Sequence, residues 1–122
     1  MNKKILIVDD EKDIVDIMTI FLNEEGYIIT CAYDGIEALD KINCNKPDLI
    51  ILDVMMPKMD VFSLNLKLKE NSETKNIPVI LMTGKSDLRK IEEAKEKSGI
   101  EDYMKKPFSM TELLNKTKSV FM

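Results

Sequence analysis

The sequence predicts an α/β fold built on a parallel β-sheet. Short apolar runs, rich in Ile, Leu and Val, alternate along the chain with segments whose apolar residues recur at helical spacing. The clearest runs are 4–8, 49–52 and 77–82. Runs this short and this apolar are typical of strands buried on both faces, as in parallel sheets, and their alternation with helices indicates βαβ units.

The composition fits one domain, 1–122, and argues against several classes of function. The 122 residues, of which 44% are hydrophobic, suffice for one buried core. A net charge of −4 without a basic cluster argues against direct nucleic-acid binding. Cys31 and Cys44 form no C-x-x-C pair, so we expect two reduced cysteines. The N-terminal apolar run is too short for a signal peptide or membrane span, which predicts a cytoplasmic protein.

The first strand is expected over 4–8 and the first helix from about 12 to 25. The helix should end near Gly26, because glycine favours the position after a helix. Asp10 could serve as its N-cap. Its expected buried face is the set of apolar residues at helical spacing: Ile14, Ile17, Met18, Phe21 and Leu22.

The second strand is expected over 27–32, where β-branched residues are dense. Asp34 and Glu37 then form a capping box that predicts the start of a short second helix. We expect this helix to bury Ile36, Leu39 and Ile42. Pro47 breaks the chain before the central strand.

The segment from Asp60 to about Lys69 is ambiguous between helix and strand. Residues 64–69 alternate between apolar and polar, as a half-buried strand would. A helix capped by Asp60 keeps the βαβα order, so we favour it. Its apolar residues fall on two adjacent helical faces: Val61, Leu64 and Leu68, then Phe62 and Leu66.

The last part of the chain predicts two more strands, over 77–82 and 100–104, and two more helices. The helix expected over 86–98 has a thin apolar stripe and should be mobile: Leu88, Ile91 and Ala94. The final helix follows a capping box at 109–112. We expect its inward residues to be Met110, Leu113, Leu114, Thr117 and Phe121.

Acidic residues follow two of the predicted strands directly. Asp9, Asp10 and Glu11 come after the first strand, and Asp53 ends the central one. Ligands of parallel α/β sheets bind outside the carboxyl ends of the strands, where these acids would meet. Neighbouring carboxylates repel each other unless a cation holds them, and a chain without histidine favours Mg²⁺. Alternatively, Asp53 merely caps the following turn.

Thr83 and Lys106 follow two further predicted strands. No glycine-rich phosphate loop can be written from the four glycines, so a phosphate would have to be bound by charge. A carboxylate such as Asp53 can attack phosphorus and form an acyl phosphate. A lysine such as Lys106 would add positive charge beside the phosphoryl group, and the hydroxyl of Thr83 would donate a hydrogen bond to one phosphoryl oxygen. A lysine before a proline is more often only a surface charge, but the three acids opposite Lys106 favour a role in the site.

The motifs resemble those of the receiver domains of two-component response regulators, over essentially the whole chain. The segments that carry the resemblance are Val8-Asp9-Asp10-Glu11, Leu52-Asp53-Val54-Met55-Met56-Pro57 with Asp60, Met82-Thr83-Gly84, Asp102-Tyr103 and Lys106-Pro107-Phe108. The resemblance implies a flavodoxin-like, doubly wound parallel sheet of five strands in the order 2-1-3-4-5 with five helices. This strand order is the known one for a chemotaxis member of this family.

The resemblance also implies residue roles. Asp53 would be the phosphoacceptor. Asp10 and Asp53 would bind Mg²⁺ directly, together with the backbone carbonyl of Met55, and Asp9 would bind it through water. The phosphoryl donor would be a histidine kinase or a histidine phosphotransfer protein.

Further implied roles concern the response to phosphate. Lys106 would contact the phosphoryl group, and Thr83 and Tyr103 would act as the switch pair. Such a domain catalyses its own phosphorylation and dephosphorylation, although it is primarily a signalling switch. A downstream target, an output domain removed from this chain, or a homodimer through 86–122 would then read the signal.

Two positions depart from the family pattern, and two rival functions stay open. Val61 stands where the family usually has glycine, and Gly84 replaces a common alanine. A haloacid dehalogenase-type phosphatase would need a second Asp at the position of Met55. A receiver that works only by docking would not need the complete acidic site.

The charge distribution predicts where partners bind. Acids outnumber bases up to residue 83, whereas bases outnumber acids from residue 84 onward. This second part contains Tyr103 and the weakly anchored helix, so we expect phosphorylation to change residues 84–108. A solvated surface is the alternative explanation for these charges.

Overall fold

The computed structural model describes residues 2–54, 61–84 and 100–122, which include five strands and four helices. The strands form one parallel sheet in the order β2-β1-β3-β4-β5. Their bounds are β1 Lys4–Val8, β2 Ile28–Ala32, β3 Leu49–Asp53, β4 Val79–Thr83 and β5 Asp102–Lys105. The helices are α1 Lys12–Glu24, α2 Gly35–Cys44, α3 Val61–Glu70 and α5 Met110–Phe121.

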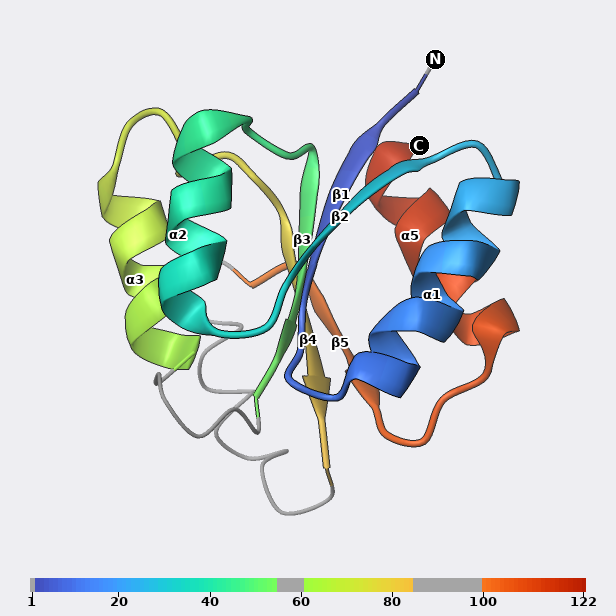
Figure 1. The fold of residues 1–122 in the computed structure, drawn as a ribbon. Coiled ribbons are helices and arrows are strands. Elements are labelled where there is room, and N and C mark those ends of the chain that lie inside the picture. The colour runs from blue at the N-terminus through green and yellow to red at the C-terminus, as the bar shows by residue number, and fades with distance from the viewer. Residues whose placement is uncertain (1, 55–60, 85–99) are drawn as a thin grey trace.

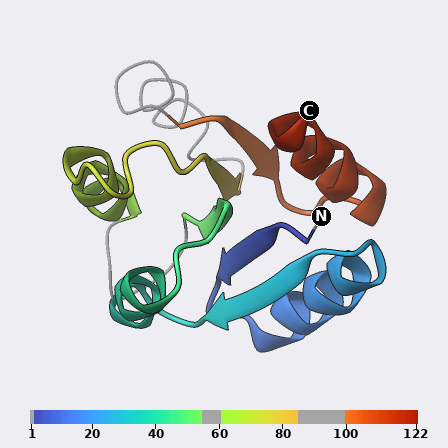
Figure 2. The ribbon, with the colours of Figure 1, turned by 90° about the horizontal axis from the view of Figure 1, so that it is seen from above.

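The described helices cover both faces of the sheet. Helices α1 and α5 lie on one face and α2 and α3 on the other (Figures 1 and 2). The predicted fold class and strand order are thereby confirmed. Four helices are described where five were expected, because the helix predicted over 86–98 lies outside the described residues, as do Asp60 and Met55.

The central strand β3 is buried along its whole length between β1 and β4. Ile50 and Leu52 pack into the core under α2 and α3. Leu49 and Ile51 pack into the core under α1 and α5. Because both faces of β3 are covered, the strand needs no polar alternation, which is why its sequence is an uninterrupted apolar run.

Of the four predicted helix caps, the one at Asp60 lies outside the described residues, and two are confirmed by their hydrogen bonds. The side chain of Asp34 accepts the backbone N–H of Glu37 at 2.8 Å, and that of Ser109 accepts the N–H of Glu112 at 3.0 Å. The prediction that Asp10 caps α1 is wrong. Glu11 occupies the N-cap without a side-chain cap, and its N–H donates to Asp9 at 2.9 Å. Asp10 is left exposed at the surface.

Three apolar residues that we expected to be buried are exposed. Ile17 is 56% exposed, Ile36 68% and Leu66 52%. The other apolar residues predicted to face the sheet include five that are buried: Met18 and Leu22 in α1, Ile42 in α2, Leu64 and Leu68 in α3. Three buried residues were not predicted: Val15 in α1, Gly35 and Ala38 in α2. Because Gly35, Ala38 and Ile42 form the buried face of α2, Ile36 falls on the outer side of the helix at 3.6 residues per turn.

None of the helices in the described ranges is both long enough and apolar enough to cross a membrane.

Candidate functional site

Three carboxylates meet at the carboxyl ends of β1 and β3. Val8 pairs with Leu52 in the sheet register, so the next residues, Asp9 and Asp53, lie side by side. Asp9 is fully buried and Asp53 is 1% exposed. With the exposed Asp10 they offer three carboxylate oxygens that all lie within 4.8 Å of one another.

This donor set fits a hard divalent cation. All three ligands are carboxylate oxygens, which Mg²⁺ and Ca²⁺ prefer over nitrogen or sulfur. Two of the carboxylates are buried beside each other, and such neighbours need a positive charge to stay ionised. The exposed Asp10 leaves the cluster open on the solvent side, where an ion could enter with its waters. The acidic cluster could therefore hold a metal ion.

Lys106 supplies a positive charge to the same cluster. It follows β5, and its backbone N–H donates to the carbonyl oxygen of Thr83 at 2.7 Å. Its Nζ lies 3.0 Å from an oxygen of Asp9, 3.3 Å from one of Asp53 and 3.5 Å from one of Glu11. Glu11 was one of the acids singled out in the sequence, but its contact with Lys106 was not predicted.

The charge on Lys106 is maintained by its neighbours. Burial lowers the pKa of this lysine, but the hydrogen bond to Asp9 and the charges of Asp53 and Asp9 outweigh burial, so its pKa is raised above its usual value. Lys106 is therefore protonated at neutral pH and places one ammonium group among three carboxylates.

Thr83 is the last residue of β4 and is fully buried. Its hydroxyl donates to the carbonyl oxygen of Gly84 at 2.9 Å. The ends of four strands thus carry the candidate site: Asp9 after β1, Asp53 on β3, Thr83 on β4 and Lys106 after β5. These strands end at the lower side of the sheet in Figure 1.

Comparison with known families matches residues 5–118 to the response regulator receiver domain. The chain belongs to this family. Among solved structures, the chain is similar to the receiver domain of the Francisella response regulator 1452. The two are 38% identical with a TM-score of 0.87, and the match covers 98% of this chain and 97% of that one. The Vibrio cholerae chemotaxis response regulator CheY4 is 32% identical with a TM-score of 0.90, over 98% and 99% of the two chains.

A longer protein contains a similar fold. The chain is 29% identical to NtrX from Brucella abortus, with a TM-score of 0.89, over 98% of this chain but 27% of that one. The receiver fold therefore occurs both as most of a solved chain and as one part of a larger one.

Tyr103 lies on the same face of the sheet as Thr83. It pairs with Leu81 in the register of β4 and β5, and Leu81 precedes Thr83 by two residues on β4. Alternate residues of a strand share a face, so Thr83 and Tyr103 both belong to the α2 and α3 side of the receiver domain. Tyr103 is part-buried and packs against the core there.

An apolar hollow of about 180 Å³ was not predicted from the sequence. It lies between α1 and the segment after Lys106, and its lining residues are Ile14, Ile17, Pro107, Phe108 and Met110. The sequence signal for it is that α1 carries more apolar residues than one buried stripe needs. In the structure, two of these residues, Ile17 and Ile20, are exposed.

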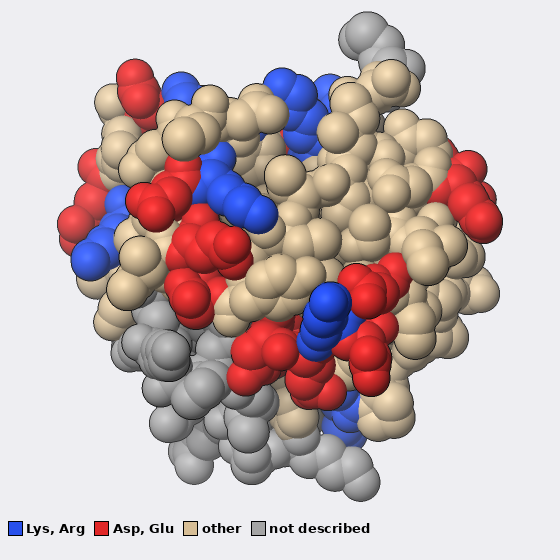
Figure 3. Space-filling view, in the orientation of Figure 1, with Lys and Arg blue, Asp and Glu red and all other residues tan. Residues whose placement is uncertain are grey.

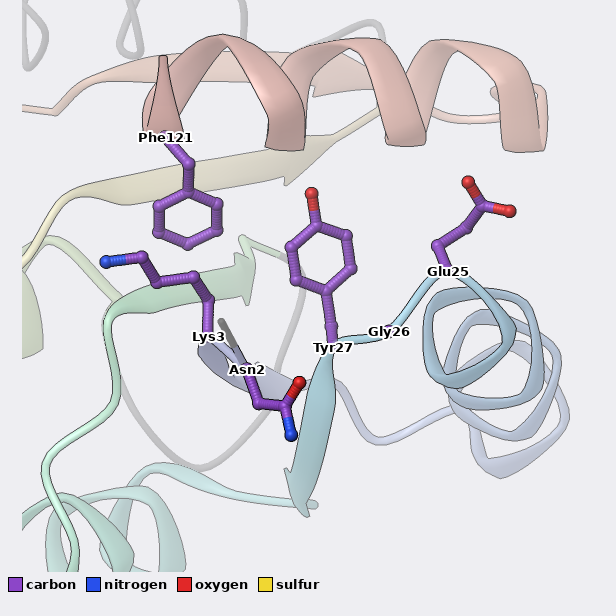
Figure 4. Close-up of a pocket in the computed structure, with 6 residues that line it drawn as sticks. All are labelled: Asn2, Lys3, Glu25, Gly26, Tyr27 and Phe121. Atoms are coloured by element: carbon purple, nitrogen blue, oxygen red, sulfur yellow. The ribbon is translucent and has the colours of Figure 1, made fainter.

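A second hollow, of about 390 Å³, lies at the opposite end of the sheet (Figure 4). Its lining residues are Asn2, Lys3, Glu25, Gly26, Tyr27 and Phe121. The rings of Tyr27 and Phe121 lie 5.8 Å apart, and the Nζ of Lys3 lies 5.6 Å from the Phe121 ring. These contacts join the end of α5 to the starts of β1 and β2, far from the acidic cluster.

The surface around the acidic cluster carries further charge. In the space-filling view, acidic side chains gather around the first turn of α1 and, separately, over α2, with basic side chains among them (Figure 3). The exposed acids at the start of α1 are Asp10, Glu11 and Asp13.

Proposed function

We propose that this receiver domain accepts a phosphoryl group on Asp53 from a phosphohistidine of a histidine kinase or a histidine phosphotransfer protein. The observation that carries the proposal is the contact of one lysine with the buried acids: Lys106 Nζ lies within 3.3 Å of both Asp9 and Asp53. A buried carboxylate held beside a fixed ammonium group is suited to receive a group that brings additional negative charge.

In the proposed transfer, a carboxylate oxygen of Asp53 attacks phosphorus. A bond forms between this oxygen and phosphorus, and the bond between phosphorus and the imidazole nitrogen of the donor breaks, with its electron pair going to nitrogen. The product is an acyl phosphate on Asp53. Lys106 neutralises charge on the phosphoryl oxygens. The Thr83 hydroxyl exchanges its hydrogen bond to Gly84 for one to a phosphoryl oxygen.

We propose Mg²⁺ as the cofactor. Asp10 and Asp53 would hold it directly with the backbone carbonyl of Met55, and Asp9 would hold it through water. When bound, the ion neutralises phosphoryl charge that Lys106 alone does not cover. Asp9 also keeps Lys106 and the N–H of Glu11 in place through its two oxygens.

The receiver domain should also catalyse two reactions without a protein partner. Small phosphodonors such as acetyl phosphate contain a reactive phosphoryl group that Asp53 can attack in the same way. Water can later attack the acyl phosphate at phosphorus, and the bond from phosphorus to the Asp53 oxygen then breaks, which releases inorganic phosphate and restores the carboxylate of Asp53. Both reactions use the same residues, so the domain is a switch that acts on itself.

The apolar hollow beside the site supports a protein donor. Ile14, Ile17 and Phe108 line it, and they lie close in sequence to Glu11 and Lys106 at the acidic cluster. A donor that brings its phosphohistidine to Asp53 must cover the surface next to the cluster. It would then bury the exposed Ile17 and the accessible parts of Ile14 and Phe108, which stabilises the complex.

The signal would be read on residues 84–108 by a target, by an output domain or by a second copy of the chain. Thr83 and Tyr103 would transmit it. The similarity to part of the longer NtrX chain supports an output domain as one of these readers.

Intact-mass spectrometry tests the phosphoacceptor. The protein is incubated with acetyl phosphate and Mg²⁺, and we expect one added phosphate that is absent without the metal and in Asp53→Asn. Asp40→Asn is the matched control, because Asp40 is an exposed acid on α2 outside the cluster. An unmodified wild type would support a docking-only receiver instead, and equal labelling of Asp53→Asn would exclude Asp53 as the acceptor.

A further inference from the structure

Lys116 of α5 contacts residues of the edge strand β5. Its Nζ lies 3.0 Å from an oxygen of Asp102 and 6.0 Å from the centre of the Tyr103 ring. Asp102 in turn accepts the backbone N–H of Tyr103 at 2.8 Å. One lysine, one acid and one aromatic ring therefore form a connected group at the edge of the sheet.

The group joins the two faces of the sheet. Met104 packs into the core on the α1 and α5 side, so Asp102, two residues earlier, belongs to that side as well. Tyr103 packs against the core on the opposite side. Because β5 is an edge strand, Lys116 can reach past it and contact both residues.

We infer that Lys116 is a positioning residue that holds the Tyr103 ring in its resting position. This inference rests on the proposed function, in which Thr83 and Tyr103 transmit the phosphorylation signal, and it adds that the Tyr103 ring turns toward Thr83 when they do so. An ammonium group near an aromatic ring is attracted to its face, and the ion pair with Asp102 fixes the ammonium group there. If the ring turns toward Thr83, it leaves the ammonium group and loses that attraction.

The contact between Lys116 and the Tyr103 ring is expected to be weak enough for a switch. Lys116 and Asp102 are both part-exposed, so the ion pair alone contributes little to stability. A cation–π contact at such a site changes the ratio of the two ring positions by about two- to fivefold. A bias of this size favours the resting position without preventing phosphorylation from reversing it.

A purely structural role for Lys116 would give a different result. If the lysine only fastens α5 to β5, its removal lowers the stability of the domain and leaves the Tyr103 rotamer unchanged. The χ1 angle of Tyr103 therefore distinguishes the two roles. Three-bond couplings from the backbone nitrogen and carbonyl carbon to Cγ measure the populations of this angle and do not depend on the charge removed.

The experiment measures these couplings in the unphosphorylated protein. Lys116→Met keeps the apolar stem and removes the charge, and we expect the ratio of minor to major Tyr103 rotamer to rise about two- to fivefold. Lys116→Arg keeps a cation and should retain the wild-type ratio. Lys118→Met is the control on the same helix, because Lys118 is exposed and outside this group. An unchanged ratio in Lys116→Met, or an equal rise in Lys118→Met, would overturn the inference.

A titration separates this inference from the proposed function. Beryllofluoride with Mg²⁺ serves as the phosphoryl mimic, and the change in the Tyr103 rotamer population is followed as its concentration rises. We expect Lys116→Met to reach half of this change at a concentration about two- to fivefold lower than wild type. If wild type responds but both proteins have the same midpoint, the inference about Lys116 is wrong. If wild type does not respond at all, the proposed function fails, while the couplings of the unphosphorylated protein still decide the role of Lys116.

Discussion

The Nζ of Lys106 lies 3.0 Å from an oxygen of Asp9, although the two residues are 97 positions apart in the chain. Since Asp9 is fully buried, this ammonium group neutralises an acid that water does not reach. The same nitrogen lies 3.3 Å from Asp53. Lys106 therefore already compensates the acidic cluster before any phosphate arrives.

The first prediction concerns the stability of this cluster. Lys106→Met should still fold, but removing one partner of buried charges is costly. We expect the free energy of unfolding to fall by about 3 kcal/mol without divalent cation, at the low end for buried pairs because the Lys106 side chain is 18% exposed. Millimolar Mg²⁺ should restore part of the loss, because a cation replaces the missing charge. Urea unfolding with and without Mg²⁺ measures both effects.

Lys105→Met is the matched control, since Lys105 is the exposed neighbour of Lys106. Its stability should stay close to wild type in both conditions. A loss of stability in Lys106→Met that Mg²⁺ does not reduce would show that Lys106 does not compensate the charge of the acids.

The raised pKa of Lys106 sets the pH range over which this lysine stabilises the fold. The stabilisation is fully present below about pH 10.5, the ordinary pKa of lysine, and is lost as the pH rises through the raised pKa of the folded state.

The second prediction concerns Asp10 and the metal. Asp10 is the exposed member of the cluster, so Asp10→Asn should leave the fold intact. It removes one of three carboxylates, and we expect the affinity for Mg²⁺ to fall about tenfold or more. Without metal the same change should raise stability slightly, because it removes a like charge near Asp9 and Asp53.

A Mg²⁺ titration followed by NMR measures the affinity. Asp13→Asn is the control, because Asp13 is an exposed acid in the first turn of α1 and lies outside the three-carboxylate cluster. If both variants lose the same affinity, the effect comes from the general acidity of this surface rather than from coordination by Asp10.

Much of the fold and of the site could be predicted from the sequence, because their signals are local. The apolar run of β3 and the acids after β1 and β3 are contiguous in the chain. The strand order came from the resemblance to a family and not from the pattern itself.

The remaining features depend on packing between distant segments. The sequence could not distinguish the buried Asp9 from the exposed Asp10, because the turn after β1 decides which side chain points inward. The outward position of Ile17 follows from the way α1 packs on the sheet. The contact of Lys116 with Tyr103 depends on how α5 lies beside the edge of β5.

The third prediction concerns the donor protein. Ile17→Ser changes an exposed residue that lines the apolar hollow, so the stability of the domain should change little. Phosphotransfer from a cognate histidine kinase should slow about fivefold or more, because buried apolar contact is lost in the complex. Phosphorylation by acetyl phosphate should keep its wild-type rate.

Ile36→Ser is the control for this variant, since Ile36 is similarly exposed on α2 and does not line the hollow. Autoradiography of the kinase reaction and intact mass of the acetyl phosphate reaction give the two rates. An equal decrease with both donors would place the defect in the chemistry of Asp53 and not in docking.

The last prediction concerns where phosphorylation is read. The Thr83 hydroxyl now donates to the carbonyl oxygen of Gly84, and a phosphoryl oxygen on Asp53 would compete for this hydrogen bond. Gly84 is the first residue of the predicted output region 84–108, which also contains Tyr103. We therefore expect phosphorylation, or beryllofluoride with Mg²⁺, to change amide hydrogen exchange across 84–108 more than across 12–45. Asp53→Asn should show neither change. Equal changes in the two regions, or a larger change in 12–45, would rule out 84–108 as the output face and leave its basic residues as a solvated surface.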